Sequence, residues 1–202
     1  GGLIALCDQD EYWSNHKIEK LVNAIGTAPM IYSDSYLCRH DLQSMNKKVS
    51  DVVNCVPFTN GLQQAVFCRI YGHATLFTRS LYNAATPFLA AIPHDWWLSY
   101  TATLHGEIKF LPEPLVYYRQ HDSNLFGVVG GKRRKHQKQD KLEKKRLEKI
   151  KIRQRVAAFY EQCPSDMERE RKVFLSLINC YQSFSLKNNI TRVILYLKNR
   201  ND

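Results

Sequence analysis

The sequence predicts an α/β domain followed by a basic helical extension. Apolar runs typical of buried strands alternate with segments of helical spacing. The chain has 202 residues and 44% hydrophobic content, which is enough for one core. Charge is unevenly placed: residues 1–131 contain 9 Lys and Arg against 11 Asp and Glu, whereas residues 132–202 contain 20 against 8. We therefore expect a mostly parallel sheet with helices in residues 1–127 and a basic helical extension in residues 128–202.

The elements of the domain follow from their apolar spacing. The run LIALC does not alternate, which is typical of a strand buried on both faces. Ile18, Leu21, Val22 and Ile25 have helical spacing, with Ser14 or Asn15 as the cap and Gly26 as the end. In chain order we then expect a strand at 28–37 that begins near Pro29, a short helix near 59–66, and a strand that continues into a helix at 72–82. A helix at 94–105 should end at Gly106. Two short strands, EIKFL and PLVYYR, should follow, separated by PEP.

The extension begins after a glycine-containing stretch that ends the domain. Lys132 to Arg155 contains 13 basic and 3 acidic residues and favours a helix with a thin apolar stripe. It is either a solvated helix or a docking surface for anionic lipid over residues 132–155. The absence of Phe, Tyr and Trp between Lys132 and Ala158 argues against nucleic acid. After Pro164 we expect two apolar helical faces, one of Phe174, Leu177, Ile178, Tyr181 and Phe184 and one of Ile190, Val193, Ile194 and Leu197.

Several classes of protein do not fit the composition. No apolar run reaches the ~18 residues that span a bilayer, and no secretion signal opens the chain. The six cysteines lack metal-type CxxC spacing, so we expect free thiols in a reducing cytosol. We predict that the protein is cytoplasmic. If the basic residues bind lipid, it would lie peripherally on the inner face of the cell membrane.

Two carboxylates follow the first predicted strand. Asp8 and Asp10 flank one glutamine directly after the apolar run. Ligands bind outside the carboxyl ends of strands in parallel sheets. One carboxylate can bind Mg²⁺ or Mn²⁺ while the other accepts a hydrogen bond from a ribose hydroxyl. The alternative is a solvated loop, where Asp-x-Asp is common.

Two further motifs lie on predicted strand-to-loop or helix-start edges. In IPHDWW, Asp95 is either a general base beside sugar-stacking Trp96 and Trp97, or part of a helix cap with both tryptophans in the core. In VYYRQHDSN, Arg119 and His121 are two residues apart and face the same side. They suit a diphosphate and a metal, or form a surface pair.

These segments together resemble family 2 glycosyltransferases of the GT-A fold. The resemblance covers roughly residues 3–127 and is greatest to bacterial enzymes that add rhamnose or similar sugars to surface polysaccharides. It implies a partial GT-A-type mixed sheet flanked by helices, a nucleotide-sugar donor, a lipid-linked or polysaccharide acceptor, and Mn²⁺ or Mg²⁺. The segments that carry it are LCDQDEYWSNHKIEKL, IYSDSYL, GHATLFTRSL and PHDWWLSYTATLHGEIKFLPEPLVYYRQHDSN.

The resemblance also implies roles for single residues. It implies that Asp8 lies towards the nucleotide ribose and that Asp10 and His121 hold the metal. Asp95 matches the base that deprotonates the acceptor hydroxyl in an inverting single displacement, while Arg119 and the metal absorb the charge of the leaving diphosphate. His73, in GHATLF, either lines the acceptor pocket or is a buried structural histidine.

The sequence departs from the family before the Asp-x-Asp element. Family members carry about 90–100 residues there, which supply the nucleotide-binding strands. We therefore expect a fragment, a truncated product or one part of a complex, with weak or absent catalysis by this chain alone and an exposed sheet edge. The alternative function is a non-catalytic remnant or a basic module that binds a membrane or nucleic acid.

Overall fold

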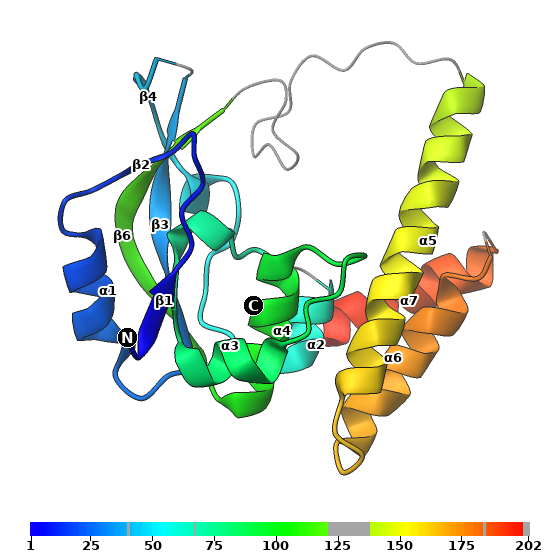
Figure 1. Ribbon diagram of the computed structural model, residues 1–202. Helices are drawn as coiled ribbons and strands as arrows, with labels where there is room; N and C mark the ends of the chain where they lie inside the picture. The colour runs from blue at the N-terminus through cyan, green and yellow to red at the C-terminus, as the bar shows by residue number, and fades with distance from the viewer. Residues whose placement is uncertain (40, 67, 121–137, 184, 200–202) are drawn as a thin grey trace.

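A curved sheet flanked by helices forms the centre of the computed structural model (Figure 1). The structure describes residues 1–39, 41–66, 68–120, 138–183 and 185–199. Helix α1 (Lys17–Ile25) covers one face of the sheet, and the other helices lie on the opposite side. The fold is therefore mixed α/β, with the expected helical extension.

The sheet is mixed rather than mostly parallel. Among the described strands, β3 and β6 form the only parallel pair, and the other pairs are antiparallel. Antiparallel neighbours need only short connections, whereas parallel neighbours need a crossover of a dozen or more residues. Strands β1, β3 and β6 still run in one direction, so their carboxyl ends lie at one edge. The order is β1 (Leu3–Ala5), β5 (Thr75–Thr78), β3 (Met30–Cys38), β6 (Ile108–Arg119) and β2 (Tyr12–Trp13), with β4 (Ser44–Lys48) paired to β3.

Strand β3 is central because it is buried on both faces. Met30 and Tyr32 pack in the large core under the helices, whereas Ile31 packs in a smaller core with Leu21 and Ile25 of α1. Three polar residues at the centre of β3, Ser33, Asp34 and Ser35, are buried as well, so its burial does not show as a continuous apolar run. The expectation that the run LIALC is buried on both faces is wrong, because β1 lies at the end of the sheet order and its side chains are only half-buried.

Strand β6 is one strand where two were expected. Ser33 of β3 pairs with Leu111, and the next residue, Asp34, pairs with Pro114. The residues between them, Pro112 and Glu113, are accommodated by a shift of register. Prolines cannot donate to a ladder and are tolerated at such bulges, so the PEP sequence bends the strand instead of ending it.

Helix α1 has a different buried stripe from the one expected. Leu21 and Ile25 are buried, but Ile18 and Val22 are 41% and 42% exposed. Lys17 takes their place, because it lies four residues before Leu21 on the same face and is fully buried. Gly26 ends the helix as predicted, with φ of 56°.

The start of α1 is also different from the expected one. Its N-cap is His16, which makes no side-chain capping bond. Ser14 contributes its backbone carbonyl to Lys17 N–H instead, at 2.9 Å.

The remaining helices of the domain agree with the predicted order, and Gly106 follows α4 as expected. Strand β4 was not predicted, because its polar sequence SMNKK has no apolar alternation. The other elements are the 3-10 helices η1 (Val49–Asp51) and η2 (Gly72–Ala74) and the helices α2 (Gly61–Val66), α3 (Arg79–Ala85) and α4 (His94–His105).

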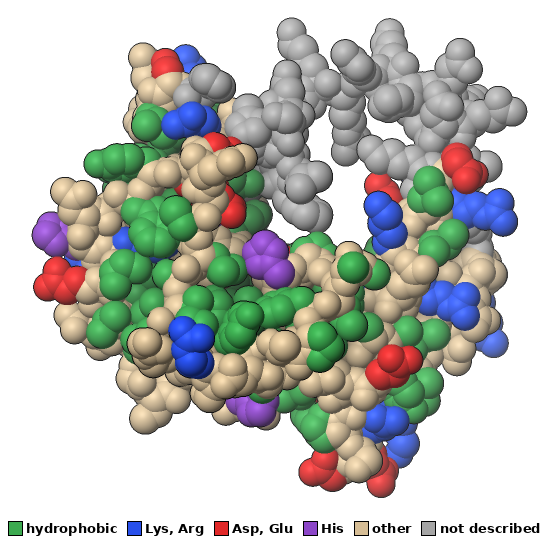
Figure 2. Space-filling model, viewed as in Figure 1, with side chains coloured by type: hydrophobic (Ala, Val, Ile, Leu, Met, Phe, Trp, Pro, Cys, Tyr) green, Lys and Arg blue, Asp and Glu red, His purple; other side chains and the backbone are tan. Residues whose placement is uncertain are grey.

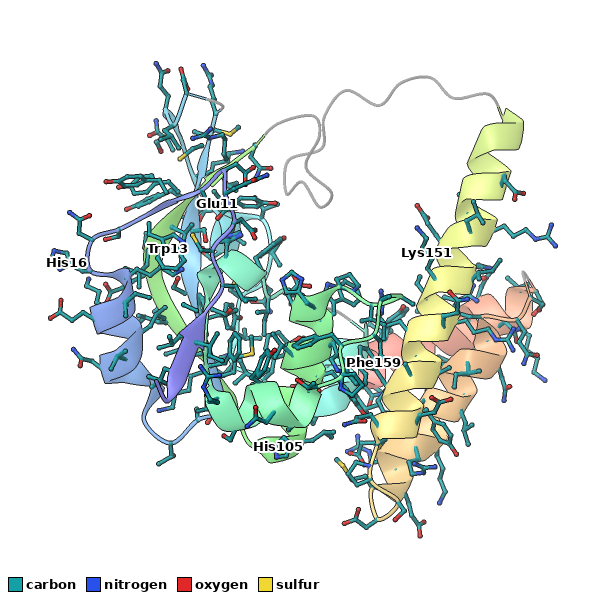
Figure 3. The ribbon with its side chains drawn as sticks, viewed as in Figure 1. Glu11, Trp13, His16, His105, Lys151 and Phe159 are labelled. Carbon is teal, nitrogen blue, oxygen red and sulfur yellow. The ribbon has the colours of Figure 1, made fainter. Side chains whose placement is uncertain are left out.

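The helical extension packs against α4 and shares the large core. Helices α5 (Lys138–Gln162), α6 (Glu168–Cys180) and α7 (Leu186–Asn199) form it. Phe159 of α5 is fully buried, stacks on Tyr100 with a centroid distance of 4.2 Å, and accepts a hydrogen bond from the Tyr100 hydroxyl on its carbonyl at 2.7 Å (Figure 3). No helix in the described part of the chain has the length and apolar character needed to cross a membrane.

The packing of Phe159 predicts that domain and extension unfold together. We expect Phe159→Ala to lower the free energy of unfolding by about 3–5 kcal/mol, because it removes a buried ring and leaves a cavity. Leu147→Ala, on an exposed position of the same helix, should change it little. Urea unfolding followed by circular dichroism and tryptophan fluorescence measures both. Two separate transitions, only one of which shifts, would contradict the shared core.

Candidate functional site

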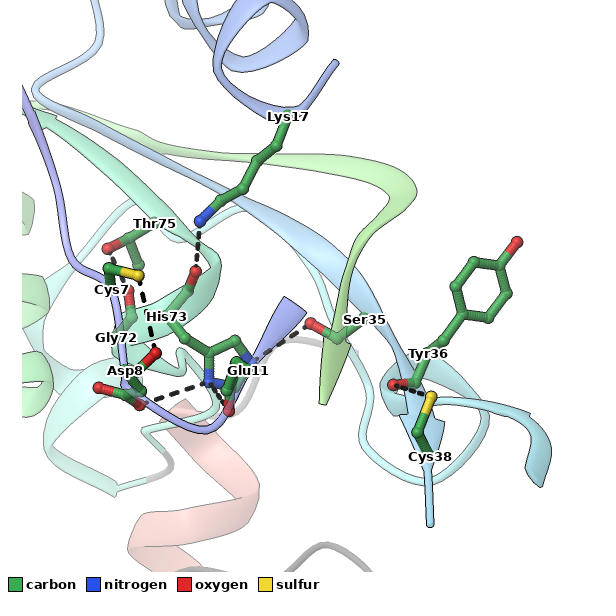
Figure 4. Close-up of polar contacts among 10 residues, drawn as sticks. All are labelled: Cys7, Asp8, Glu11, Lys17, Ser35, Tyr36, Cys38, Gly72, His73 and Thr75. Carbon is green, nitrogen blue, oxygen red and sulfur yellow. Dashed lines mark hydrogen bonds and ion pairs between the residues drawn. The ribbon is translucent and has the colours of Figure 1, made fainter. Parts of the chain in front are cut away.

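The candidate site lies past the carboxyl end of β1, where β5 starts, and against the later halves of β3 and β6. Strand β5 is antiparallel to β1 and begins opposite Tyr32 of β3. The 3-10 helix η2 immediately precedes β5 and places His73 beside the loop that follows β1 (Figure 4). This is the position that the sheet rule predicts for a ligand site.

Three side chains form what we call the His73 group: Asp8, Glu11 and His73. The Nδ1 atom of His73 is 3.1 Å from Glu11 Oε1 and 3.9 Å from Asp8 Oδ2. One donor atom from each residue lies within 4.8 Å of the others. Asp8 is exposed, whereas the His73 side chain is buried, so the group opens to solvent on the Asp8 side.

The His73 ring is held in place from several directions. Its Nε2 lies 3.4 Å from the Ser35 hydroxyl, and its ring packs against Tyr118 and Tyr71 with centroid distances of 4.6 and 5.8 Å. Burial, together with the nearby charge of Lys17, lowers the pKa of His73 to about 3. The imidazole is therefore neutral, which is the form that binds metal ions.

Glu11 is the most strongly perturbed carboxyl of the group. Its side chain is 3% exposed, and its Oε2 atom has no hydrogen-bond partner among the described residues (Figures 3 and 4). Burial, and then the charges of Asp8 and Asp10, raise its pKa to about 8. A buried carboxylate oxygen without a partner is costly, and a bound cation would compensate for it.

Lys17 supports the group from the opposite side. Its ammonium donates to the backbone carbonyl of His73 at 2.6 Å and lies 3.2 Å from the centre of the Trp13 ring. Burial lowers its pKa to about 7, although the charges of nearby acidic groups, Glu11 among them, act in the opposite direction. The lysine therefore fixes η2 relative to α1.

The His73 group fits a divalent cation. Two carboxylates and one neutral imidazole are a donor set that suits Mn²⁺ better than Mg²⁺, which prefers oxygen alone. With Nδ1 as the ligand atom, Nε2–H would donate to Ser35, and such an outer hydrogen bond is usual for a metal-binding histidine.

This donor set differs from the one the sequence suggested. Asp10 is not one of the three donors, but its charge acts on the pKa of both Glu11 and His73, so it lies nearby. His121 lies outside the described residues. Asp8, expected towards the ribose, is a member of the group.

Asp95 lies beside the same segment. Its carboxylate accepts a hydrogen bond from the backbone N–H of Trp96 at 2.9 Å, and the nearby N–H group of Gly72 favours its charged form. A Cβ atom on Gly72 would lie 3.7 Å from the Cβ of Asp95 and 3.0 Å from Nε2 of His94, so a larger residue would require the His94 ring to shift by a few tenths of an ångström. Burial raises the pKa of Asp95 despite these interactions.

The tryptophans and Arg119 have other surroundings. Trp97 is buried in the core, where its Nε1–H donates to the Ala85 carbonyl at 2.7 Å. Of the two alternatives for this residue, sugar stacking or core packing, the structure shows core packing. The Trp96 ring has the Arg155 guanidinium 3.6 Å from its centre. Arg119 ends β6 opposite Cys38, and its neighbour Tyr118 is the β6 side chain that contacts His73.

Sequence reasoning missed Glu11, Lys17 and Ser35. Lys17 had a signal, since it lies four and eight residues before Leu21 and Ile25 on one helical face. Glu11 follows Asp10 directly, but no periodicity in the loop distinguishes it. Ser35 lies in a strand whose polar residues gave no indication of the face they occupy.

The chain matches no family model and no curated protein.

The unpaired oxygen of Glu11 predicts cation binding. We expect Mn²⁺ to bind with an affinity that falls about tenfold for each pH unit below 8, because the cation must displace the Glu11 proton. Glu11→Gln should abolish binding, and Glu19→Gln, an exposed change on α1, should leave it intact. Titration calorimetry between pH 6 and about 8.5 measures this. Unchanged binding by Glu11→Gln would contradict the assignment.

The depressed pKa of Lys17 predicts a rise of stability with pH. Between about 7 and the ordinary value of 10.5 the unfolded chain binds the proton that the folded chain has lost, so the free energy of unfolding increases. Lys17→Met should remove this increase. Lys20→Met, on the exposed side of the same helix, should retain it. Urea unfolding at a series of pH values from about 7 to 9.5 gives the slopes, and equal slopes in both variants would refute the prediction.

Proposed function

We propose that the chain acts in metal-dependent, inverting glycosyl transfer from a nucleotide-sugar donor to a lipid-linked or polysaccharide acceptor. The observation that supports it is that Asp8 and Asp95 both lie next to the Gly72–His73 segment. These residues come from motifs far apart in the sequence, and the resemblance to family 2 glycosyltransferases assigns them to donor and acceptor, respectively. The non-catalytic remnant is the competing hypothesis.

The His73 group would hold Mn²⁺ or Mg²⁺. The cation, when bound, would neutralise the charge of the donor diphosphate. Glu11 and Asp8 supply the anionic donors, and Lys17 keeps the neutral His73 in position through its backbone carbonyl. The raised pKa of Glu11 limits this function to neutral and higher pH.

Asp95 would take the proton of the acceptor hydroxyl. A carboxylate offers about four lone-pair sites, and the Trp96 N–H group uses one on Oδ1 of Asp95, so acceptor capacity remains for the hydroxyl. Burial raises the pKa of Asp95, which makes it a stronger base than an exposed aspartate. The deprotonated oxygen would then attack the anomeric carbon from the face opposite the leaving diphosphate.

This function places the chain in the cytoplasm, on the inner side of the membrane where the acceptor is located. All six cysteines are free thiols, which fits a reducing compartment.

The proposal predicts that Asp95 controls turnover and leaves donor binding unchanged. With Mn²⁺ and a panel of UDP-, GDP- and dTDP-sugars, we expect slow release of nucleoside diphosphate. Asp95→Asn should reduce kcat by about 10²–10⁴-fold with little change in KM for the donor. Asp166→Asn, an exposed change in the extension, is the matched control.

Two results would contradict this proposal. If Asp95→Asn turned over as fast as the parent chain, Asp95 would not be the base. If no nucleotide sugar raised the Tm in the presence of Mn²⁺, the remnant hypothesis would be favoured, even where Mn²⁺ itself bound.

A further inference from the structure

Helix α7 exposes a continuous apolar stripe. Its members repeat at intervals of three and four residues, so they lie on one side of the helix. Each is between 45% and 74% exposed, although large apolar side chains are usually buried. The sequence predicted this face but not that it would be exposed. The stripe consists of Leu186, Ile190, Val193, Ile194 and Leu197.

The opposite side of α7 is anchored to the rest of the extension. The guanidinium of Arg192 donates to the Cys180 carbonyl at 2.5 Å, and the Tyr196 and Tyr181 hydroxyls are 2.5 Å apart. Arg192 is buried by this contact. Rotation of the helix to bury the stripe would break these polar contacts, so the stripe is held facing outward.

The charges of α7 are all of one sign. The helix contains Lys187, Arg192 and Lys198 and no Asp or Glu. Lys187 and Lys198 are exposed, and helical geometry places both along the same border of the stripe. Figure 2 shows Lys and Arg side chains on the extension, together with several Asp and Glu side chains. The charges next to the stripe on α7 itself are thus positive.

We propose that α7 docks the chain onto an anionic lipid bilayer, with its apolar stripe at the boundary between headgroups and acyl chains. A helix of this kind lies in the plane of the interface and does not cross it. The lysines on the border would extend their ammonium groups to the lipid phosphates while their stems remain against the apolar layer. This inference concerns the extension and does not rest on glycosyl transfer.

Charge decides between a bilayer and a second copy of the chain. An antiparallel pair of copies that met through this stripe would bring Lys187 of one against Lys198 of the other, with no acidic residue on α7 to pair with them. Such like-charge pairs oppose association. An anionic surface attracts the same lysines, so the apolar and electrostatic contributions act together only in the lipid case.

Sedimentation with vesicles tests the docking surface. We expect the whole chain to bind vesicles of phosphatidylcholine with phosphatidylserine, and to bind vesicles of phosphatidylcholine alone at least tenfold more weakly. Ile190→Ser/Ile194→Ser should weaken binding to the anionic vesicles roughly a hundredfold. Lys187→Gln/Lys198→Gln should weaken it roughly tenfold and reduce its dependence on salt.

A matched control is available on α1. Ile18→Ser/Val22→Ser changes two apolar residues that are similarly exposed, on the face of the sheet away from the extension (Figure 1). It should bind vesicles like the parent chain. Circular dichroism should show that each variant retains its helices, since every changed side chain is exposed.

Three outcomes would overturn the proposal: no binding to anionic vesicles at any salt concentration, equal loss of binding in the α1 control, or a dimer in the absence of lipid that Ile190→Ser/Ile194→Ser converts to a monomer. The last outcome would assign the stripe to a second copy. Sedimentation velocity without lipid detects it.

Discussion

The buried ammonium of Lys17 is the constraint on which the candidate site depends. A lysine in an apolar helix stripe is costly unless its charge is compensated. Here the compensation comes from the His73 carbonyl and the face of Trp13. These contacts come from η2 and β2. The need to compensate one charge therefore holds both segments against α1 and fixes His73 in place.

Much of the fold could be predicted because local patterns agree with tertiary burial. The strand expected at 28–37 forms β3, and the glycine after α4 ends that helix, as the sequence indicates. The failures have a common cause in long-range pairing. Nothing local in LIALC shows that β5 pairs with it antiparallel, and PEP gives no sign that a register shift with β3 keeps β6 continuous.

The position of the site could be predicted from the sequence, but only some of its residues could. Asp8 follows a strand, and strand ends are where such sites lie. Glu11 joins the group because the chain turns after β1 and brings Oε1 to His73, and no pattern in a short loop encodes that turn. The contact of Ser35 with His73 depends on which face of β3 is turned to η2. The register shifts on both sides of Asp34 change which residues lie on that face. Sequence motifs therefore indicate which residues can do chemistry, and packing selects among them.

Helix α4 joins the site to the extension. Its first turn carries Asp95, which Gly72 holds beside the His73 group. One residue later, Trp96 is covered by Arg155 of α5, and Tyr100 donates to Phe159 of the same helix. The position of Asp95 thus depends on α5 as much as on the sheet. Because the extension and α4 share one core, a bilayer bound along α7 would hold Asp95 at a fixed height above the lipid surface. Under the proposed glycosyl transfer, the packing of α4 on the extension would set the distance between Asp95 and an acceptor anchored in that surface.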